Sequence, residues 1–171
     1  DDASCSPATC VGQGVGFDDC VKQQIPAPYG TYGITVDFMQ RVWTAGYASD
    51  PNAIMRYDPR APAGSRFGVV PFGTYTGGIA ADAEGWVWAA AYDRGVVRVN
   101  AETLEWTIVA GTVPPGGTSC KGMAIDQTGK IWTINQSGAN DATVIVPGPT
   151  IADATVTTGV SPGPSFRYTY S

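Results

Sequence analysis

The sequence predicts an all-β fold made of three copies of one structural repeat. Each copy has a glycine that opens an apolar strand, an aspartate four residues later and a tryptophan six residues after the aspartate. The three sets recur at intervals of 45 and then 44 residues. A period of about 40–50 residues filled with short alternating strands and turns is typical of a β-propeller blade. The repeated residues are Gly33, Gly78 and Gly122, Asp37, Asp82 and Asp126, and Trp43, Trp88 and Trp132.

The composition agrees with this fold class. The 171 residues include 22 Gly and 13 Pro, and only 15% are charged, which suits a turn-rich β protein and leaves little material for amphipathic helices. The net charge of −5 and the absence of a Lys/Arg cluster argue against a nucleic-acid partner. No apolar run approaches the length of a membrane span.

The second repeat has no insertion and shows the four strands of a blade most clearly. Gly85 lies in the turn after the first strand, where a positive φ is often needed. In the next strand, Trp86 and Trp88 should share one face and Val87 the other, because side chains alternate along a strand. The predicted strands are 78–82, 86–92, 96–100 and 104–110.

The other two repeats follow the same plan with local differences. In the third, Gly129 takes the position of Gly85, and 143–146 and 154–158 are the last two strands. In the first, Gln40 replaces the glycine, so we expect a turn of a different type. Residues 48–52 and 59–64 lengthen the loops of that repeat and should lie at the surface.

Unmatched strands at both ends predict an incomplete ring. Residues 20–25 read as the outer strand of one further blade, and 166–170 as the inner strand of another. Since a propeller typically closes with about four to eight blades, another polypeptide, the remainder of the same precursor, is expected to complete it. The predicted units are a Cys-rich leader (1–19), an outer strand (20–28), blades at 29–73, 74–117 and 118–164, and a first strand (165–171).

The repeat resembles the blades of streptogramin-lyase-like propellers and, more loosely, NHL-type repeats. The resemblance rests on the glycine-led strand, the Asp-x-x-Gly turn and the Val-Trp or Ile-Trp strand, over 29–160. These residues are structural: we expect the tryptophans to pack between blades and the aspartates to accept hydrogen bonds from turn backbone. Calcium at the turns is a less favoured alternative, because Asp-x-x-Gly offers too few oxygen ligands, so no cofactor or metal site is predicted.

The four cysteines favour an oxidising compartment. Cys5, Cys10, Cys20 and Cys120 have no common zinc-ligand spacing, and the chain contains no histidine. Two disulfides are therefore expected, in a protein that is secreted, periplasmic or on the cell surface. Three pairings are open, and we favour Cys5 with Cys10 and Cys20 with Cys120.

The lack of histidine also limits the chemistry. It excludes a Ser-His-Asp triad and a Cys-His nucleophile within the chain. The resemblance implies a histidine and magnesium in the streptogramin lyases, but no residue here matches that histidine, so no catalytic residue is predicted. The favoured function is a non-catalytic secreted module that binds a glycan, peptide or protein. The alternatives are a lyase-type enzyme whose site lies on other blades, and a structural component of a surface assembly.

Aromatic and polar residues gather in the loops that join outer to inner strands and second to third strands. Such side chains suit contacts with a sugar or a peptide, although loop Tyr and Asp residues are also common on any β protein. The candidate ligand-binding residues are Tyr32, Tyr47, Asp50, Tyr75, Tyr92, Asp93, Arg94, Lys121, Asn135 and Asp141.

Overall fold

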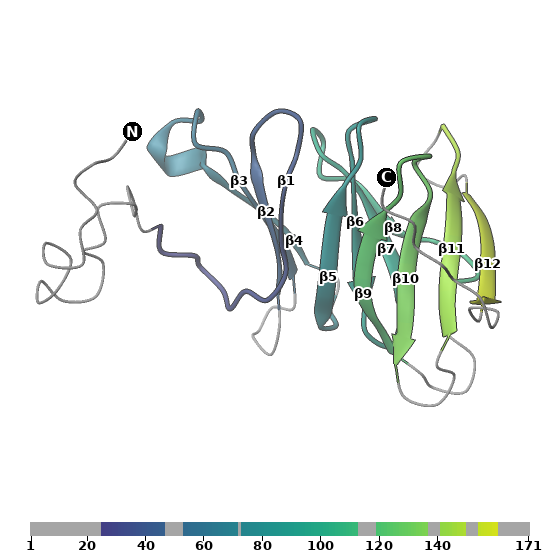
Figure 1. Cartoon of the computed structure of the whole chain (residues 1–171). Helices are drawn as coiled ribbons and strands as arrows, with labels where there is room; N and C mark the ends of the chain where they lie inside the picture. The colour runs from purple at the N-terminus through teal and green to yellow at the C-terminus, as the bar shows by residue number, and fades with distance from the viewer. Residues whose placement is uncertain are drawn as a thin grey trace, which may run out of the picture.

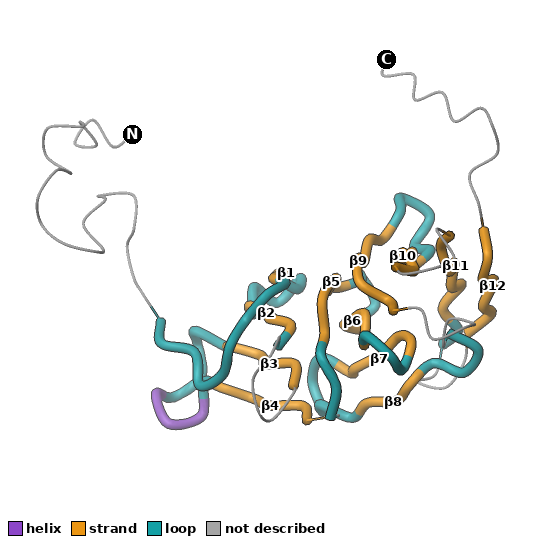
Figure 2. The backbone as a smooth tube through the Cα atoms, turned by 90° about the horizontal axis from the view of Figure 1, so that it is seen from below, coloured by secondary structure: helices purple, strands orange, loops and turns teal. Residues whose placement is uncertain are grey.

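Three four-stranded antiparallel sheets make up the computed structural model, which describes residues 25–46, 53–71, 73–112, 119–136, 141–149 and 154–160. Each sheet uses four strands that are consecutive in sequence (Figure 1). Seen along the strands, the sheets form a fan with β1, β5 and β9 at its inner edge (Figure 2). This confirms the all-β propeller segment. The predicted strand at 166–170 lies outside the described residues, as does 20–25 apart from Ile25, which is irregular.

We name the sheets blades 1, 2 and 3. Blade 1 contains β1 (Ile34–Val36), β2 (Val42–Ala45), β3 (Ala53–Tyr57) and β4 (Phe67–Pro71), with a short 3-10 turn η1 (Ala63–Ser65) before β4. Blade 2 contains β5 (Thr76–Ala81), β6 (Trp86–Ala91), β7 (Gly95–Asn100) and β8 (Trp106–Ile108). Blade 3 contains β9 (Ser119–Ile125), β10 (Ile131–Gln136), β11 (Asp141–Pro147) and β12 (Ala154–Val160).

The prediction of a different turn at Gln40 is wrong. Gln40 has a φ of 61°, in the same left-handed region as Gly85 at 90° and Gly129 at 79°. Its N–H donates to the carbonyl of Asp37 at 2.8 Å, as the N–H of Gly129 donates to that of Asp126 at 2.9 Å. The turns after Asp37, Asp82 and Asp126 are therefore of one type, a three-residue loop closed by a residue in the left-handed region. The closing hydrogen bonds hold Gln40 in a conformation that usually favours glycine.

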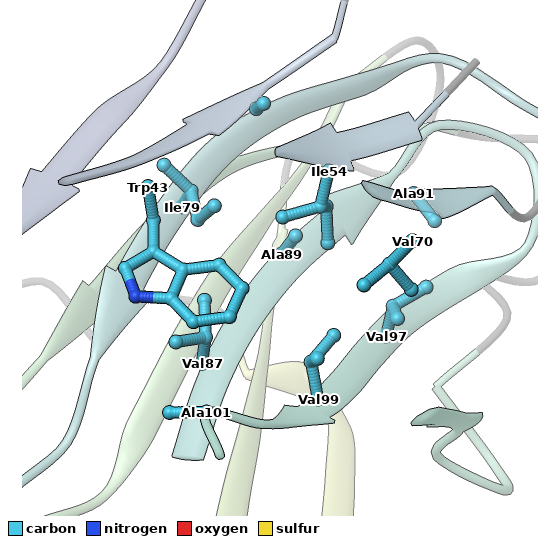
Figure 3. Close-up of a cluster of buried hydrophobic side chains, with 11 residues drawn as sticks. Trp43, Ile54, Val70, Ile79, Val87, Ala89, Ala91, Val97, Val99 and Ala101 are labelled. Atoms are coloured by element: carbon cyan, nitrogen blue, oxygen red, sulfur yellow. The ribbon is translucent and has the colours of Figure 1, made fainter. Parts of the chain in front are cut away.

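The hydrophobic core lies between the blades. Trp43 from β2 packs with Ile54 and Val70 of its own blade against Val87, Val97 and Val99 of blade 2 (Figure 3). On the opposite face of blade 2, Trp88 packs against Ile131 and Ile145 of blade 3. Neither Trp43 nor Trp88 has any exposed surface, which confirms that these two pack between blades, whereas Trp132, in the last of the three sheets, is half-buried.

Neighbouring inner strands approach backbone to backbone. A Cβ on Gly77 would lie 2.5 Å from the carbonyl oxygen of Lys121, and a Cβ on Gly78 would clash with the backbone nitrogen of Met123. Glycine is needed here because no other residue lets β5 come this close to β9. The blades are also joined at this end, since the N–H of Cys120 donates to the carbonyl of Tyr92 at 2.9 Å.

Candidate functional site

The repeated aspartates hold the hairpins together by hydrogen bonds. One carboxylate oxygen of each accepts the indole N–H of the tryptophan six residues later, at 2.9, 2.7 and 2.9 Å in blades 1, 2 and 3. The other accepts the backbone N–H four residues later, at 3.0, 2.8 and 3.1 Å. The predicted role in turn bonding is confirmed, and the indole bond adds to it. The pairs are Asp37 with Trp43, Asp82 with Trp88 and Asp126 with Trp132.

In blades 1 and 3 these bonds favour the ionised carboxylate. Burial acts to raise the pKa of Asp37, but hydrogen bonds from Trp43 and Arg41 outweigh burial and lower the pKa overall. The hydroxyl of Thr128, followed by the indole of Trp132, holds the pKa of Asp126 well below its ordinary value. At neutral pH Asp37 and Asp126 are anionic acceptors, which suits a structural role and does not suit a proton donor.

The described residues of the predicted ligand-binding loops lie at one end of the sheets, where β5 begins and β6 ends, and we call this end the loop face. Tyr75, just before β5, and Tyr92, just after β6, meet edge to face with their ring centroids 6.4 Å apart. Tyr32 lies just before β1 with 60% of its surface exposed. Asp93 and Arg94 are exposed beside Tyr92. Thus the structure brings Tyr75, Tyr92 and Asp93 into one neighbourhood, where Asp93 accepts a hydrogen bond from Thr74 at 2.5 Å.

Other predicted residues are less accessible. Asn135 is buried and donates to Asp141 at 2.6 Å and to Thr143 at 3.2 Å, so its amide braces the β10–β11 hairpin. Lys121 is half-buried within β9. Tyr47 and Asp50 lie outside the described residues.

Cys120 is a free, buried thiol, so the predicted disulfide between Cys20 and Cys120 is not present. Its sulfur lies 3.7 Å from the carbonyl oxygen of Thr112 and 3.6 Å from Oδ1 of Asn135, in the interface between blades 2 and 3. Burial raises the pKa of Cys120 to about 11, which keeps the thiol protonated and unreactive. Cys5, Cys10 and Cys20 lie outside the described residues.

A groove that the sequence did not predict lies at the opposite end of blades 2 and 3. It has a volume of about 700 Å³ and runs between the turn before β6, the turn before β10 and the residues after β11. Trp86 and Lys130 project from corresponding positions of two repeats, at which blade 1 carries Arg41. This exchange of residue type within the repeat is a sequence signal for the groove.

No group of three or more Asp, Glu, Cys or His side chains in the described part of the chain could hold a metal ion. No helix in that part is long and apolar enough to cross a lipid bilayer.

Comparison with known proteins adds the fold relationship. No protein-family profile and no curated protein sequence matches the chain. A catalytically inactive virginiamycin B lyase from Staphylococcus aureus, solved with quinupristin, is similar with 18% identity and a TM-score of 0.66, covering 82% of this chain and 45% of that one. A Bacteroides thetaiotaomicron protein of unknown function has 14% identity and a TM-score of 0.55, covering 78% and 34% respectively.

An extracellular domain of a one-component system from B. thetaiotaomicron is also similar, with 18% identity, a TM-score of 0.53, and coverage of 77% of this chain and 19% of that one. The chain thus spans less than half the length of each of these proteins. Identities at this level establish the fold alone. The three sheets and these similarities together show that the chain folds as three blades of a β-propeller.

Proposed function

We propose that this chain is part of a secreted, non-catalytic β-propeller that binds a glycan, peptide or protein at the loop face. The observation that carries the proposal is the Tyr75–Tyr92 pair, which presents aromatic surface next to the carboxylate of Asp93. Tyr75 is 43% exposed, so its ring is accessible to a ligand. Aromatic faces next to a few polar groups favour sugars and peptides.

Further blades are proposed to cover the outward face of blade 3, supplied by the remainder of the same precursor. In blade 2, Trp88 and Ala90 face blade 3 and have no exposed surface. The corresponding residues of blade 3 are Trp132, which is half-buried, and Ile134, which is 58% exposed. Exposed apolar surface at the positions that elsewhere bury a blade contact favours another blade as the partner.

Alanine substitutions at the tyrosine pair test the binding function. The protein is assayed against arrays of glycans and peptides, and any ligand found is then titrated against the Tyr75→Ala and Tyr92→Ala variants. Removing one ring is expected to weaken binding about tenfold, the effect of losing a good stacking contact. Trp106→Ala is the matched control, because Trp106 is 38% exposed on the outer strand β8, away from the loop face. Unchanged affinity in both tyrosine variants would contradict the proposal.

The lyase alternative predicts a reaction product, whereas the binding function predicts none. The fold similarity to virginiamycin B lyase keeps this alternative open, with its active site on blades outside this chain. The assembled protein is incubated with quinupristin, and the reaction is followed by liquid chromatography with tandem mass spectrometry, which separates quinupristin from an isomeric product. Intact quinupristin supports a binding function, whereas a cleaved product would establish the enzyme. A role as a structural component of a surface assembly would instead appear as an ordered polymer of the purified protein.

A further inference from the structure

The groove between blades 2 and 3 is separate from the loop face. It opens at the other end of the strands, since Tyr75 precedes β5 whereas the groove residues follow it. Its volume of about 700 Å³ is in the range of small-molecule sites, about 300–1,000 Å³. The lining residues used below are Asp82, Glu84, Trp86, Arg98, Lys130 and Pro149.

The same place between blades 1 and 2 is closed by a side chain. Arg41 lies there almost fully buried. Its Nε donates to Oδ2 of Asp37 at 2.7 Å, and its Nη1 crosses to Oε1 of Glu102 in blade 2, also at 2.7 Å. The guanidinium therefore fills the end of this interface and bridges the two blades.

The two interfaces can be matched residue by residue. Nη1 of Arg56 in β3 donates to the carbonyl of Ala101 in blade 2 at 2.8 Å. In the next interface, Nη2 of Arg98 in β7 donates to the carbonyl of Gly148 in blade 3, also at 2.8 Å. Nη1 of Arg56 also donates to the carbonyl of Glu102 at 3.3 Å. The strand register pairs Trp88 with Arg98 in blade 2 and Trp132 with Val144 in blade 3, so Glu102 corresponds to Gly148.

This match shows why the second interface is open. The partners of the Arg41–Glu102 bridge are replaced there by Trp86 and Gly148, which cannot form an ion pair. The indole of Trp86 turns to the guanidinium of Arg98, whose central carbon lies 4.1 Å from the ring centroid. The exchange removes the side chain that would close the end of the interface and leaves an indole and a proline as walls.

The walls carry balanced charge. Asp82 and Glu84 are matched by Arg98 and Lys130, so the groove favours neither an anion nor a cation. Glu84 and Lys130 are exposed and offer an acceptor and a donor. Oδ2 of Asp82 accepts the Trp88 indole at 2.7 Å, whereas Oδ2 of Asp37 also accepts a second donor, Nε of Arg41. One further donor from a ligand can therefore take the place that the guanidinium fills in blade 1.

We propose that this groove binds a neutral oligosaccharide. Sugar hydroxyls both donate and accept hydrogen bonds, which suits a site with a carboxylate and an ammonium group at matched charge. The apolar faces of pyranose rings pack against indole and proline surfaces, as the Trp86 and Pro149 walls offer. A strongly charged ligand would meet one repulsive pair of side chains.

The test uses the full chain labelled with 5-fluorotryptophan, which gives one fluorine signal for each of the five tryptophans. Cellotetraose, maltotetraose and chitotetraose are titrated separately. The Trp86 signal, assigned with Trp86→Phe, is expected to shift and saturate with a Kd of about 1 mM or tighter for at least one of them, while the Trp106 signal stays unchanged. If none of the three moves the Trp86 signal at about 10 mM, the proposal is overturned.

Variants then locate the binding. Glu84→Gln and Lys130→Gln change exposed side chains and are each expected to weaken the affinity about tenfold. The double substitution Trp86→Arg with Gly148→Glu rebuilds the bridge of the first interface and should abolish binding, whereas Trp106→Ala should leave it unchanged. Tyr75→Ala, which tests the loop face, should also have no effect here. Full binding in the rebuilt double variant would contradict the proposal.

Discussion

At the residue scale, the fold depends on one polar bond repeated in every blade. Each aspartate joins its turn to the indole of the second strand, so a buried tryptophan has its N–H satisfied while its rings pack between blades. The sequence predicted the turn bonds because Asp commonly accepts them at corners. It did not predict the indole bond, because that contact depends on how far the turn brings Asp82 over Trp88.

Replacing Trp88 with Ala tests the packing role. Trp88 is wholly buried, so the variant should lose about 3–5 kcal/mol of unfolding free energy, measured by urea denaturation. Trp132→Ala is the matched variant. The Trp132 side chain is half-buried, so its removal should cost less unfolding free energy when no further blade covers blade 3. A loss below about 1 kcal/mol at Trp88 would show that the indole does not support the core.

The lowered carboxylate pKa values predict acid sensitivity. A group whose pKa is lower in the folded state stabilises the protein above its unfolded pKa of about 3.9, and this stabilisation is lost as the pH falls through the folded value. Stability should therefore decrease below about pH 4, in part through Asp37 and Asp126. Asp126→Asn should reduce stability at neutral pH and flatten the acid decrease in urea denaturation. Glu105→Gln, an exposed change, is the control, and an unaltered profile in Asp126→Asn would refute the assignment.

At the element scale, strands were easier to predict than turns. Alternation placed Trp86 and Trp88 on one face and Val87 on the other, and the two core clusters confirm it. The turn at Gln40 was missed because residue type shows a preference for the left-handed region and the closing hydrogen bonds can override it. The strand glycines were recognised as a repeat, but their reason, the backbone approach of β5 to β9, became visible only in three dimensions.

Substitutions at Gly78 and Gly64 test this close approach, with Gly64 as the control position. A Cβ on Gly78 meets the backbone of β9, which cannot move without shifting the blade, whereas a Cβ on Gly64 has nothing within 4 Å. Gly78→Ala should therefore destabilise by about 1–3 kcal/mol, as overpacking does, and Gly64→Ala should be nearly neutral. Thermal unfolding of the two variants measures the difference. Equal melting temperatures would contradict the backbone-to-backbone packing of the inner strands.

At the scale of the whole molecule, the sequence predicted the architecture better than the sites. The repeat indicated the blades, and the loop face followed from blade topology, with Tyr75 and Tyr92 brought together as a pair. The groove was not predicted because it depends on which residues face each other across two blades: Arg41 and Glu102 in one interface, and Trp86 and Gly148 at the same positions in the next. Contacts between different repeats depend on how far each side chain extends, and an alignment of the repeats does not show this.

The central claim is that these three blades belong to a larger ring whose further blades cover the apolar outward face of blade 3. The most direct test is the mass of the purified protein in solution, measured by light scattering during size exclusion. We predict a complex heavier than 17.8 kDa for the unmodified protein. The Ile134→Glu variant should have only the mass of the single chain, because it places a charge on the outward face of blade 3, where Ile134 is 58% exposed. A stable, monodisperse monomer of 17.8 kDa for the unmodified protein would contradict the claim.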